Sequence, residues 1–426
     1  MSRSFISDLQ RAGRSRFLII GCGLASASVT ARYLGPAGSG AMAALLVFPS
    51  LFMSLGSMGV RQSAGYLLGQ GAADENSLRS AILAVWLFTS AFGASISYLA
   101  IRYLSSFHDT MLSAIAVSAV PFTLYPSYLS GIYLGKNKLN EVNRVDWVPP
   151  AVTFLLNLLL VVGLGMELAG ALIAYAAGPM AVFAAVVWLN PLPIRSKPSL
   201  AVVMSLLRLG LLYALSLFII NLNYRIDLVL LDRLTSATEL GLYAKGASVT
   251  QYLWQIPMLL SLIVFARGTG ASDPREYSKK VARLLRVSLV LVGLASIGLC
   301  LLAKPIVLLL YGPLFERSAD VIRVLLGGVV VLTVFKVMNM DLASKGRPWV
   351  AVWAMLPSLV VNVGLNLLLI PRMGAMGAAV ASTVSYCVAG VLFSFFYARS
   401  VRIRLREIFG YRRDDLDYLL SKLRRK

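Results

Sequence analysis

The sequence is dominated by a succession of long apolar stretches separated by short polar segments. A helix needs about 20 predominantly apolar residues to cross the hydrocarbon core of a bilayer. Stretches of that length with few charges predict an all-α polytopic membrane protein with twelve transmembrane helices. The predicted spans cover residues 17–34, 41–68, 80–104, 111–134, 148–166, 168–190, 206–231, 241–266, 284–311, 321–344, 349–370 and 375–398.

The composition leaves little room for anything outside the membrane. Of the 426 residues, 58% are hydrophobic and 14% are charged, whereas an ordinary soluble domain is about half apolar and about a quarter charged. Twelve spans use about 240 to 280 residues, which leaves about 150 for all loops and both termini. The sequence therefore excludes an ordinary soluble globule and a large soluble domain.

The chain is strongly basic, with 40 Lys and Arg against 19 Asp and Glu and a formal net charge of +21. In a soluble protein this charge would suggest nucleic acid, but the basic residues of a polytopic protein collect in cytoplasmic loops and set its orientation. With the N-terminus inside, 29 basic residues fall in cytoplasmic segments and five in external ones. We therefore expect two cytoplasmic termini, a basic cytoplasmic tail over residues 399–426 and no nucleic-acid partner.

An internal repeat indicates that the chain arose by duplication. Two pairs of segments recur at an offset near 200 residues: Asn157-Leu-Leu-Leu with Gly170-Ala171 matches Asn366-Leu-Leu-Leu with Gly377-Ala378, and Leu34 with Gly40 matches Leu234 with Gly241. An offset of six spans keeps both copies in the same orientation, as in repeats related by an axis normal to the membrane. We therefore predict two six-helix lobes at residues 1–200 and 201–398.

Motifs for catalysis and nucleotide binding are missing from the sequence. A phosphate-binding loop requires Gly-x4-Gly-Lys-Ser/Thr, and the nearest segment, Gly241 to Gly246, has its lysine misplaced at position 245. The single histidine, His108, lies in a short external loop, and no catalytic triad can be assembled around it. The three cysteines lie in apolar stretches without metal-ligand spacing. We therefore predict that the chain is not an enzyme and binds no metal or cofactor.

Six basic and two acidic residues fall within the predicted spans or at their ends. They are Arg32, Arg61, Arg225, Lys245, Arg323 and Lys336, with Asp227 and Asp341. A charge at the centre of a spanning helix costs at least about 2.5 kcal/mol, so it faces a protein interior or a wet cavity. Arg32 and Arg323, near predicted outer ends, have the alternative of extending their charged heads to the interface. The basic excess predicts a cavity that attracts anions and repels organic cations.

Six segments spread along the chain carry a resemblance to a known family. They are Ala31-Arg-Tyr-Leu-Gly-Pro-Ala-Gly-Ser-Gly40, Leu55-Gly-Ser-Met-Gly-Val-Arg61, Arg225-Ile-Asp227, Glu239-Leu-Gly-Leu-Tyr243, Asn366-Leu-Leu-Leu-Ile-Pro371 and Gly377-Ala-Ala-Val. These segments resemble the polysaccharide-transporter branch of the multidrug/oligosaccharidyl-lipid/polysaccharide exporter superfamily. The resemblance implies a multi-pass flippase of the bacterial inner membrane, which moves undecaprenyl-diphosphate-linked oligosaccharide repeat units from the cytoplasmic to the periplasmic leaflet for surface polysaccharide assembly. It also implies alternating access between the two lobes.

The resemblance further implies that cationic cavity residues bind the diphosphate. By position these residues are Arg32, Arg61, Arg225, Lys245 and Lys336. Peptidoglycan-precursor flippases of the same superfamily have two further C-terminal helices, whereas this chain ends in a basic tail, which disfavours that function. Outward movement of a substrate with a charge of about −2 across an inside-negative membrane gains about 2.3 kcal/mol per charge per 100 mV. The membrane potential is therefore a candidate driving force, and Asp227 is a candidate proton or sodium coupling site.

Aromatic and amide side chains in the spans are candidate sugar contacts. They are Tyr125, Tyr128, Tyr252 and Gln255, although tyrosines in spans also serve as packing or interfacial residues. Besides the lipid-linked substrate and the bilayer, a glycan polymerase and glycosyltransferases are candidate partners. Two rival functions stay open. One is a cation-coupled multidrug exporter of the same superfamily, for which acidic cavity residues are scarce, and the other is a non-transporting membrane scaffold for glycan assembly.

Overall fold

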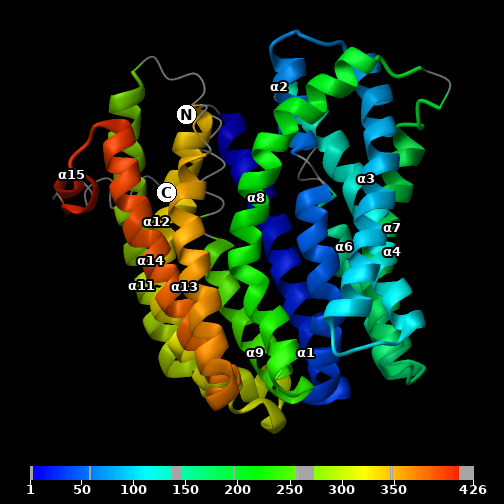
Figure 1. The fold of residues 1–426 in the computed structure, drawn as a ribbon, viewed down its shortest axis with the longest axis vertical. Coiled ribbons are helices and arrows are strands. Elements are labelled where there is room, and N and C mark those ends of the chain that lie inside the picture. The colour runs from blue at the N-terminus through cyan, green and yellow to red at the C-terminus, as the bar shows by residue number, and fades with distance from the viewer. Residues whose placement is uncertain are drawn as a thin grey trace. The chain divides into compact units, whose positions relative to one another are not determined.

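The computed structural model is helical throughout the part of the chain that it describes. That part comprises residues 3–56, 59–136, 145–194, 197–255, 257, 273–345, 347 and 349–411. In chain order the helices are α1 (Arg3–Gly56), α2 (Val60–Gly69), α3 (Glu75–Leu104), α4 (Thr110–Gly135), α6 (Val148–Leu156), η1 (Asn157–Gly163), α7 (Glu167–Leu189), α8 (Leu200–Leu234), α9 (Ala237–Gln251), η2 (Tyr252–Trp254), α11 (Pro274–Tyr311), η3 (Pro313–Phe315), α12 (Ser318–Ser344), α13 (Val350–Met373), α14 (Ala375–Val401) and α15 (Leu405–Phe409) (Figure 1). The all-α prediction is confirmed.

Within the described ranges, nine helices are long and apolar enough to cross a membrane, which confirms the multi-pass prediction. The first two predicted spans form one long element, α1 with its continuation α2. Inside α1 the backbone breaks at Gly35, with φ 66° and ψ −176°, a conformation essentially restricted to glycine. Pro36 follows and lacks the N–H that a continuous helix needs. The break lies between the two predicted spans, and the exact number of twelve crossings stays a prediction.

The helices assemble into two compact units. The first unit contains residues 1–244 and 308–315, and the second contains residues 245–307 and 316–426. In the first unit, α8 packs against α1, α2 and α3. The boundaries of these units fall at other residues than the predicted lobe boundary at residue 200, and the division into lobes 1–200 and 201–398 stays a prediction.

Each unit has a tightly packed interior. In the first unit, buried side chains of α2, α3 and α4, including Leu78, Ile82 and Leu124, form one apolar core. In the second unit, α12 and α14 approach closely where a Cβ atom added at Gly390 would lie 2.9 Å from the carbonyl oxygen of Val331. Such small residues at helix contacts compensate for the weak hydrophobic drive between helices in lipid.

The repeated Asn-Leu-Leu-Leu segments make matching contacts in the two units. Both asparagines are fully buried, and each is followed three positions later by the leucine on which the next helix packs. A Cβ atom added at Gly170 would lie 3.2 Å from Leu160, and one added at Gly377 would lie 2.5 Å from the carbonyl oxygen of Leu369. This correspondence supports the internal repeat.

Candidate functional site

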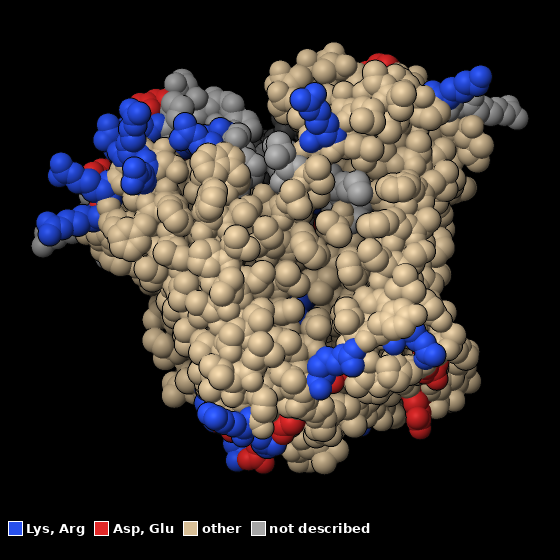
Figure 2. All heavy atoms as spheres, in the orientation of Figure 1, with Lys and Arg blue, Asp and Glu red and all other residues tan. Residues whose placement is uncertain are grey.

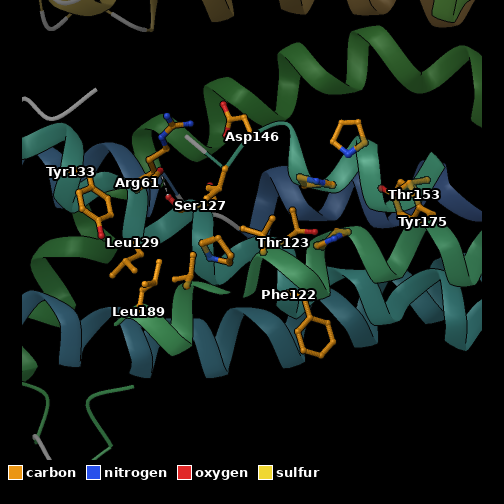
Figure 3. A pocket seen from close by; sticks show the side chains of 18 of the residues that line it. Arg61, Phe122, Thr123, Ser127, Leu129, Tyr133, Asp146, Thr153, Tyr175 and Leu189 are labelled. Atoms are coloured by element: carbon orange, nitrogen blue, oxygen red, sulfur yellow. Dashed lines mark hydrogen bonds between the residues drawn. The ribbon is translucent and has the colours of Figure 1, made fainter. Parts of the chain in front are cut away.

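The first unit contains a cavity of about 820 Å³ that is lined by residues of α1, α2, α4, α6 and α7. Every residue of its wall belongs to this unit. Arg61, Tyr133 and Asp146 lie toward one end, whereas Thr153 and Tyr175 lie toward the other (Figure 3). In the predicted topology the end with Arg61 is nearer the cytoplasm, because α2 and α4 both run inward toward it.

The position of Arg61 is fixed by a close contact between two helices. Helix α2 begins directly after Gly59, which has the left-handed backbone conformation, so Arg61 lies in its first turn. A Cβ atom added at Gly131 of α4 would lie 2.4 Å from the carbonyl oxygen of Arg61, and one added at Gly135 would lie 2.9 Å from that of Gly65. Glycines spaced by four on both helices thus let the backbones touch, which holds the arginine at the cavity.

The guanidinium of Arg61 retains hydrogen-bonding capacity at the cavity. Its Nε atom is buried and has no hydrogen-bond partner among the described residues. The carboxylate of Asp146 attracts the arginine electrostatically, and the two side chains lie near each other in Figure 3. Asp146 is exposed, just before α6, whereas Arg61 is partly buried. Because a guanidinium presents five donors in a planar fork, Arg61 is suited to bind an anionic group that enters the cavity.

The remaining described wall is uncharged and rich in hydroxyl groups. These come from Ser26, Thr123, Ser127, Ser130, Tyr133, Thr153 and Tyr175. Prolines add acceptors, since Pro126 and Pro179 lack the N–H groups that would bond the carbonyls of Phe122 and Tyr175 in a regular helix. Hydroxyl groups donate and accept hydrogen bonds. The wall therefore suits a neutral, hydroxylated ligand that carries its negative charge near Arg61.

Arg225 and Asp227 lie on α8 in the same unit but outside the cavity wall. Arg225 is partly buried, and its charge acts on Tyr175 of the wall. Asp227 is fully buried and accepts a hydrogen bond from the hydroxyl of Tyr243. Arg225 therefore adds a positive potential at the end of the cavity where Tyr175 lies, while Asp227 is bonded to Tyr243.

Arg32 lies outside the cavity wall, and its guanidinium is bonded to backbone carbonyls of α11. Its Nη2 atom donates to the carbonyl of Leu309 at 2.6 Å, and its Nε atom donates to that of Leu310 at 3.2 Å. These carbonyls belong to the last turn of α11, where helical partners are missing. Arg32 therefore caps a helix, and it is exposed outside the cavity. Arg323 is also exposed and pairs with Asp320 at 2.7 Å.

The other predicted cations belong to the second unit. Lys336 of α12 lies over the ring of Trp254, with its Nζ atom 4.6 Å from the ring centroid, a favourable cation–π arrangement. Tyr252 and Gln255 flank this tryptophan in the chain, and both are partly buried. Lys245 of α9 is also partly buried. Lys336 thus contacts Trp254 in space. The candidate sugar contacts Tyr252 and Gln255 lie close to the same tryptophan in the chain.

Tyr125 and Tyr128 are core residues of the first unit. Their exposed fractions are 1% and 0%. The hydroxyl of Tyr128 shares a 2.9 Å hydrogen bond with Thr89, and the ring of Tyr125 meets Trp86 edge-on at 5.3 Å. Neither lines the cavity. The structure therefore places these two candidate sugar contacts in the packing role that the sequence left open.

Sequence reasoning missed several residues of the cavity wall. Asp146 was not singled out because the search for acids was confined to predicted spans, and it lies just before one. Thr123, Ser127 and Ser130 recur on α4 at +4 and +3, which brings them to one side of a helix. That spacing was a detectable signal, but hydroxyl residues also commonly hydrogen-bond to neighbouring helices.

Two family models match the chain. Residues 29–320 match the model described as polysaccharide biosynthesis protein, and residues 257–414 match that of the lipid II flippase MurJ. A probable low-salt glycan biosynthesis flippase, Agl15 of Haloferax volcanii, is 22% identical over 183 residues. This match covers 42% of the chain and 39% of that relative, so the chain matches well under half the length of the curated protein.

Solved structures of similar fold are transporters. The lipid II flippase MurJ in an inward-closed conformation has a TM-score of 0.74 at 14% identity, over 96% of this chain and 91% of MurJ. An inward-facing multidrug resistance transporter of the MATE family has a TM-score of 0.72 at 14% identity, over 89% of this chain and 94% of its own. At these identities the likeness shows the fold alone, and it confirms the predicted all-α polytopic fold.

Proposed function

Because the chain belongs to the family of polysaccharide biosynthesis proteins, we propose that it is a flippase for undecaprenyl-diphosphate-linked oligosaccharide repeat units. It moves them from the cytoplasmic to the periplasmic leaflet of a bacterial inner membrane for surface polysaccharide assembly, with both termini in the cytoplasm. The family membership confirms the resemblance drawn from the sequence segments. The matches to flippases and transporters also agree with the prediction that the chain is not an enzyme.

The observation that carries this proposal is the combination of Arg61 with a hydroxyl-rich wall in one cavity. A lipid-linked oligosaccharide has an anionic diphosphate, a polyhydroxylated sugar and an apolar polyprenyl chain. Arg61 suits the diphosphate through charge-assisted hydrogen bonds. The wall hydroxyls suit the sugar, and the polyprenyl chain stays in the bilayer.

Asp146 gives the cavity a way to exchange its anion. Without substrate, the carboxylate partly balances the charge of Arg61, which lowers the cost of keeping a guanidinium in a partly buried place. An entering diphosphate competes with Asp146 for the same donors. The attraction between Arg61 and Asp146 then favours release of the substrate.

A second group of cations continues the path in this proposal. In the predicted topology Arg225 and Lys245 lie in the outer halves of consecutive spans, so they receive the diphosphate after Arg61 as the two lobes alternate. Lys336 belongs to the second unit and is the remaining proposed cation. We leave Arg32 out of this path because its guanidinium is bonded to the end of α11.

Energy for transport comes, in this proposal, from the membrane potential or from a proton or sodium gradient. The buried pair of Asp227 and Tyr243 is the candidate coupling site, since a carboxylate in a membrane interior is a typical proton carrier. A glycan polymerase and glycosyltransferases are the proposed partners, because they would consume and supply the lipid-linked repeat unit.

The test is transport in vesicles that contain the purified protein and a fluorescent lipid-linked oligosaccharide. We expect wild-type protein to expose the glycan on the opposite leaflet and Arg61→Gln to lose this activity while inserting normally. Arg323→Gln, an exposed arginine outside the cavity, is the matched control. Wild-type flipping by Arg61→Gln would remove the cavity mechanism. Transport of organic cations instead would favour the multidrug exporter, and transport of neither would favour the scaffold.

A further inference from the structure

The second unit carries an apolar groove on its surface. The groove has a volume of about 370 Å³ and is lined by side chains of four helices, among them Leu289 of α11, Val331 of α12, Val391 of α14 and Phe409 of α15. Its one polar wall residue is Ser394, whose hydroxyl donates to the carbonyl of Gly390 at 2.7 Å. Because that hydroxyl donates its hydrogen within its own helix, the groove offers a ligand almost entirely apolar contacts.

The short helix α15 forms part of the wall of this groove. The chain leaves α14 through Arg402, which has a left-handed backbone conformation with φ 54°. Leu405 and Phe409 of α15 then reach the groove, and Ile408 is fully buried. The side chain of Arg286 donates to the carbonyls of Glu407 and Ile408 at 2.9 and 3.1 Å. Since the last carbonyls of a helix lack helical partners, this buried arginine fixes α15 in place.

The outer face of α15 and its approach is basic. Arg402, Arg404 and Arg406 are exposed, and they alternate with the buried or partly buried Ile403 and Leu405. In Figure 2, Lys and Arg gather around the position of α15, above a surface that shows no charged side chains. Exposed arginines beside an apolar surface are typical of the boundary between lipid headgroups and acyl chains.

We propose that the groove and α15 form a binding site for an anionic diacyl phospholipid from the leaflet that α15 faces. One acyl chain lies in the groove along Val331, Val391 and Phe395, and the phosphate-containing headgroup lies against Arg404 and Arg406. The occupant follows from charge complementarity, because the site joins an apolar slot to three exposed arginines, and basic groups close to a membrane surface attract anionic lipids. The site is independent of the substrate cavity, which lies in the other unit.

Two other occupants give different experimental outcomes. Bulk lipid would fill the groove without regard to headgroup. The segment 412–426, which follows Tyr411 and lies outside the described residues, contains leucines that could cover an apolar slot and exclude lipid. Both outcomes are separable from specific binding of an anionic lipid.

The experiment uses the full-length protein in vesicles with a photoactivatable acyl chain on either phosphatidylglycerol or phosphatidylcholine of identical chain length. Crosslinks are mapped by peptide mass spectrometry. We expect phosphatidylglycerol to label residues 330–334 and 390–395 about fivefold more than phosphatidylcholine, since each arginine near the headgroup adds to the attraction. Equal labelling by both lipids, or absence of label from the groove, would overturn the proposal.

Matched variants separate the headgroup contact from the groove. Val391→Trp, which fills the slot, and the double variant Arg404→Gln/Arg406→Gln should each lower the phosphatidylglycerol label to the phosphatidylcholine level. Leu301→Trp, on an exposed part of α11 outside the groove, and Arg317→Gln/Arg372→Gln should leave it unchanged. If Val391→Trp does not fold, Phe395→Ala, which removes one wall of the slot, replaces it. Unchanged labelling in folded groove and arginine variants would refute the site.

Discussion

Arg61 and Asp146 are the two charged residues in the described wall of the cavity, and their charges are of opposite sign and attract each other. We expect Asp146→Asn to bind a diphosphate more tightly than wild type, because the anion no longer competes with a carboxylate. The gain should be about two- to fivefold, since the attraction between an arginine and an exposed carboxylate contributes at most about 1 kcal/mol. Titration of purified protein with farnesyl diphosphate measures this effect.

Asp320→Asn provides the control for this measurement, because it removes an exposed carboxylate that pairs with Arg323 in the second unit. Its affinity for the diphosphate should equal that of wild type. Weaker or unchanged binding by Asp146→Asn would show that Asp146 does not compete with the ligand.

Asp341, the second acidic residue within the predicted spans, is held in a buried hydrogen-bond network. It is fully buried and accepts hydrogen bonds from Ser278, Lys345 and Tyr397 at 2.7 to 2.8 Å. Asp341→Ala should lower the free energy of unfolding by about 1 to 3 kcal/mol, because it leaves the buried hydroxyl groups of Ser278 and Tyr397 without their acceptor and removes the counter-ion of the partly buried Lys345. Denaturant unfolding of the purified protein measures this loss, with Asp320→Ala as the exposed control. Equal stability of the two variants would contradict the assignment.

These residues show how far sequence reasoning reaches. Arg61 and Asp341 stand out because a charge in an apolar stretch needs a special environment. What that environment is depends on residues far away in the chain: Asp341 is bound by Ser278 and Tyr397, and Arg32 is bound by the end of α11. A spacing pattern within one helix does not contain this information, so the sequence could not separate a ligand site from a cap or a buried network.

The contact between α2 and α4 decides where Arg61 lies. Gly131→Ala would place its Cβ atom 2.4 Å from the carbonyl oxygen of Arg61, so α2 must shift. We expect a loss of about 1 to 3 kcal/mol in unfolding free energy, as for other overpacked contacts. Flipping per folded molecule should also fall, although Arg61 is unchanged. Unfolding and vesicle transport, measured on the same preparation, test both effects.

Gly364→Ala is the matched control for this helix contact, because nothing lies within 4 Å of a Cβ atom at that position of α13. It should keep both stability and transport. If Gly131→Ala behaves like Gly364→Ala, the close approach of α2 and α4 does not position the arginine.

The helices themselves were largely predictable. The apolar stretches give α3, α4, α7, α12, α13 and α14 close to their predicted positions, because lipid-facing helices must be long and apolar. Two features depend on backbone geometry that hydropathy does not register. Gly35 and Pro36 break α1 without a polar loop, and Asn157–Gly163 forms a π-helix that ends the fifth predicted span. The short helix α15 lies within the predicted basic tail of residues 399–426, of which residues 412–426 lie outside the described residues.

The internal repeat connects the sequence to the architecture. Gly40 and Gly241, paired by the repeat, lie directly against each other, since a Cβ atom added at Gly241 would be 2.9 Å from the backbone nitrogen of Gly40. Both glycines belong to the first unit. Their contact agrees with the pairing of these residues in the repeat, and the two-lobe division stays a prediction.

The sign of the substrate charge makes transport sensitive to voltage. In the proposed direction a diphosphate leaves an inside-negative compartment, and each charge that crosses the full field gains about 2.3 kcal/mol per 100 mV. We expect outward flipping in potassium-loaded vesicles to accelerate when valinomycin imposes an inside-negative potential and to slow when the potential is reversed. Asp227→Asn should keep this voltage response but lose any acceleration by a proton or sodium gradient, if the pair with Tyr243 is the coupling site. A rate independent of both potential and gradient would exclude electrogenic transport of the diphosphate and would favour a neutral exchange, in which each outward-moving substrate is matched by compensating charge.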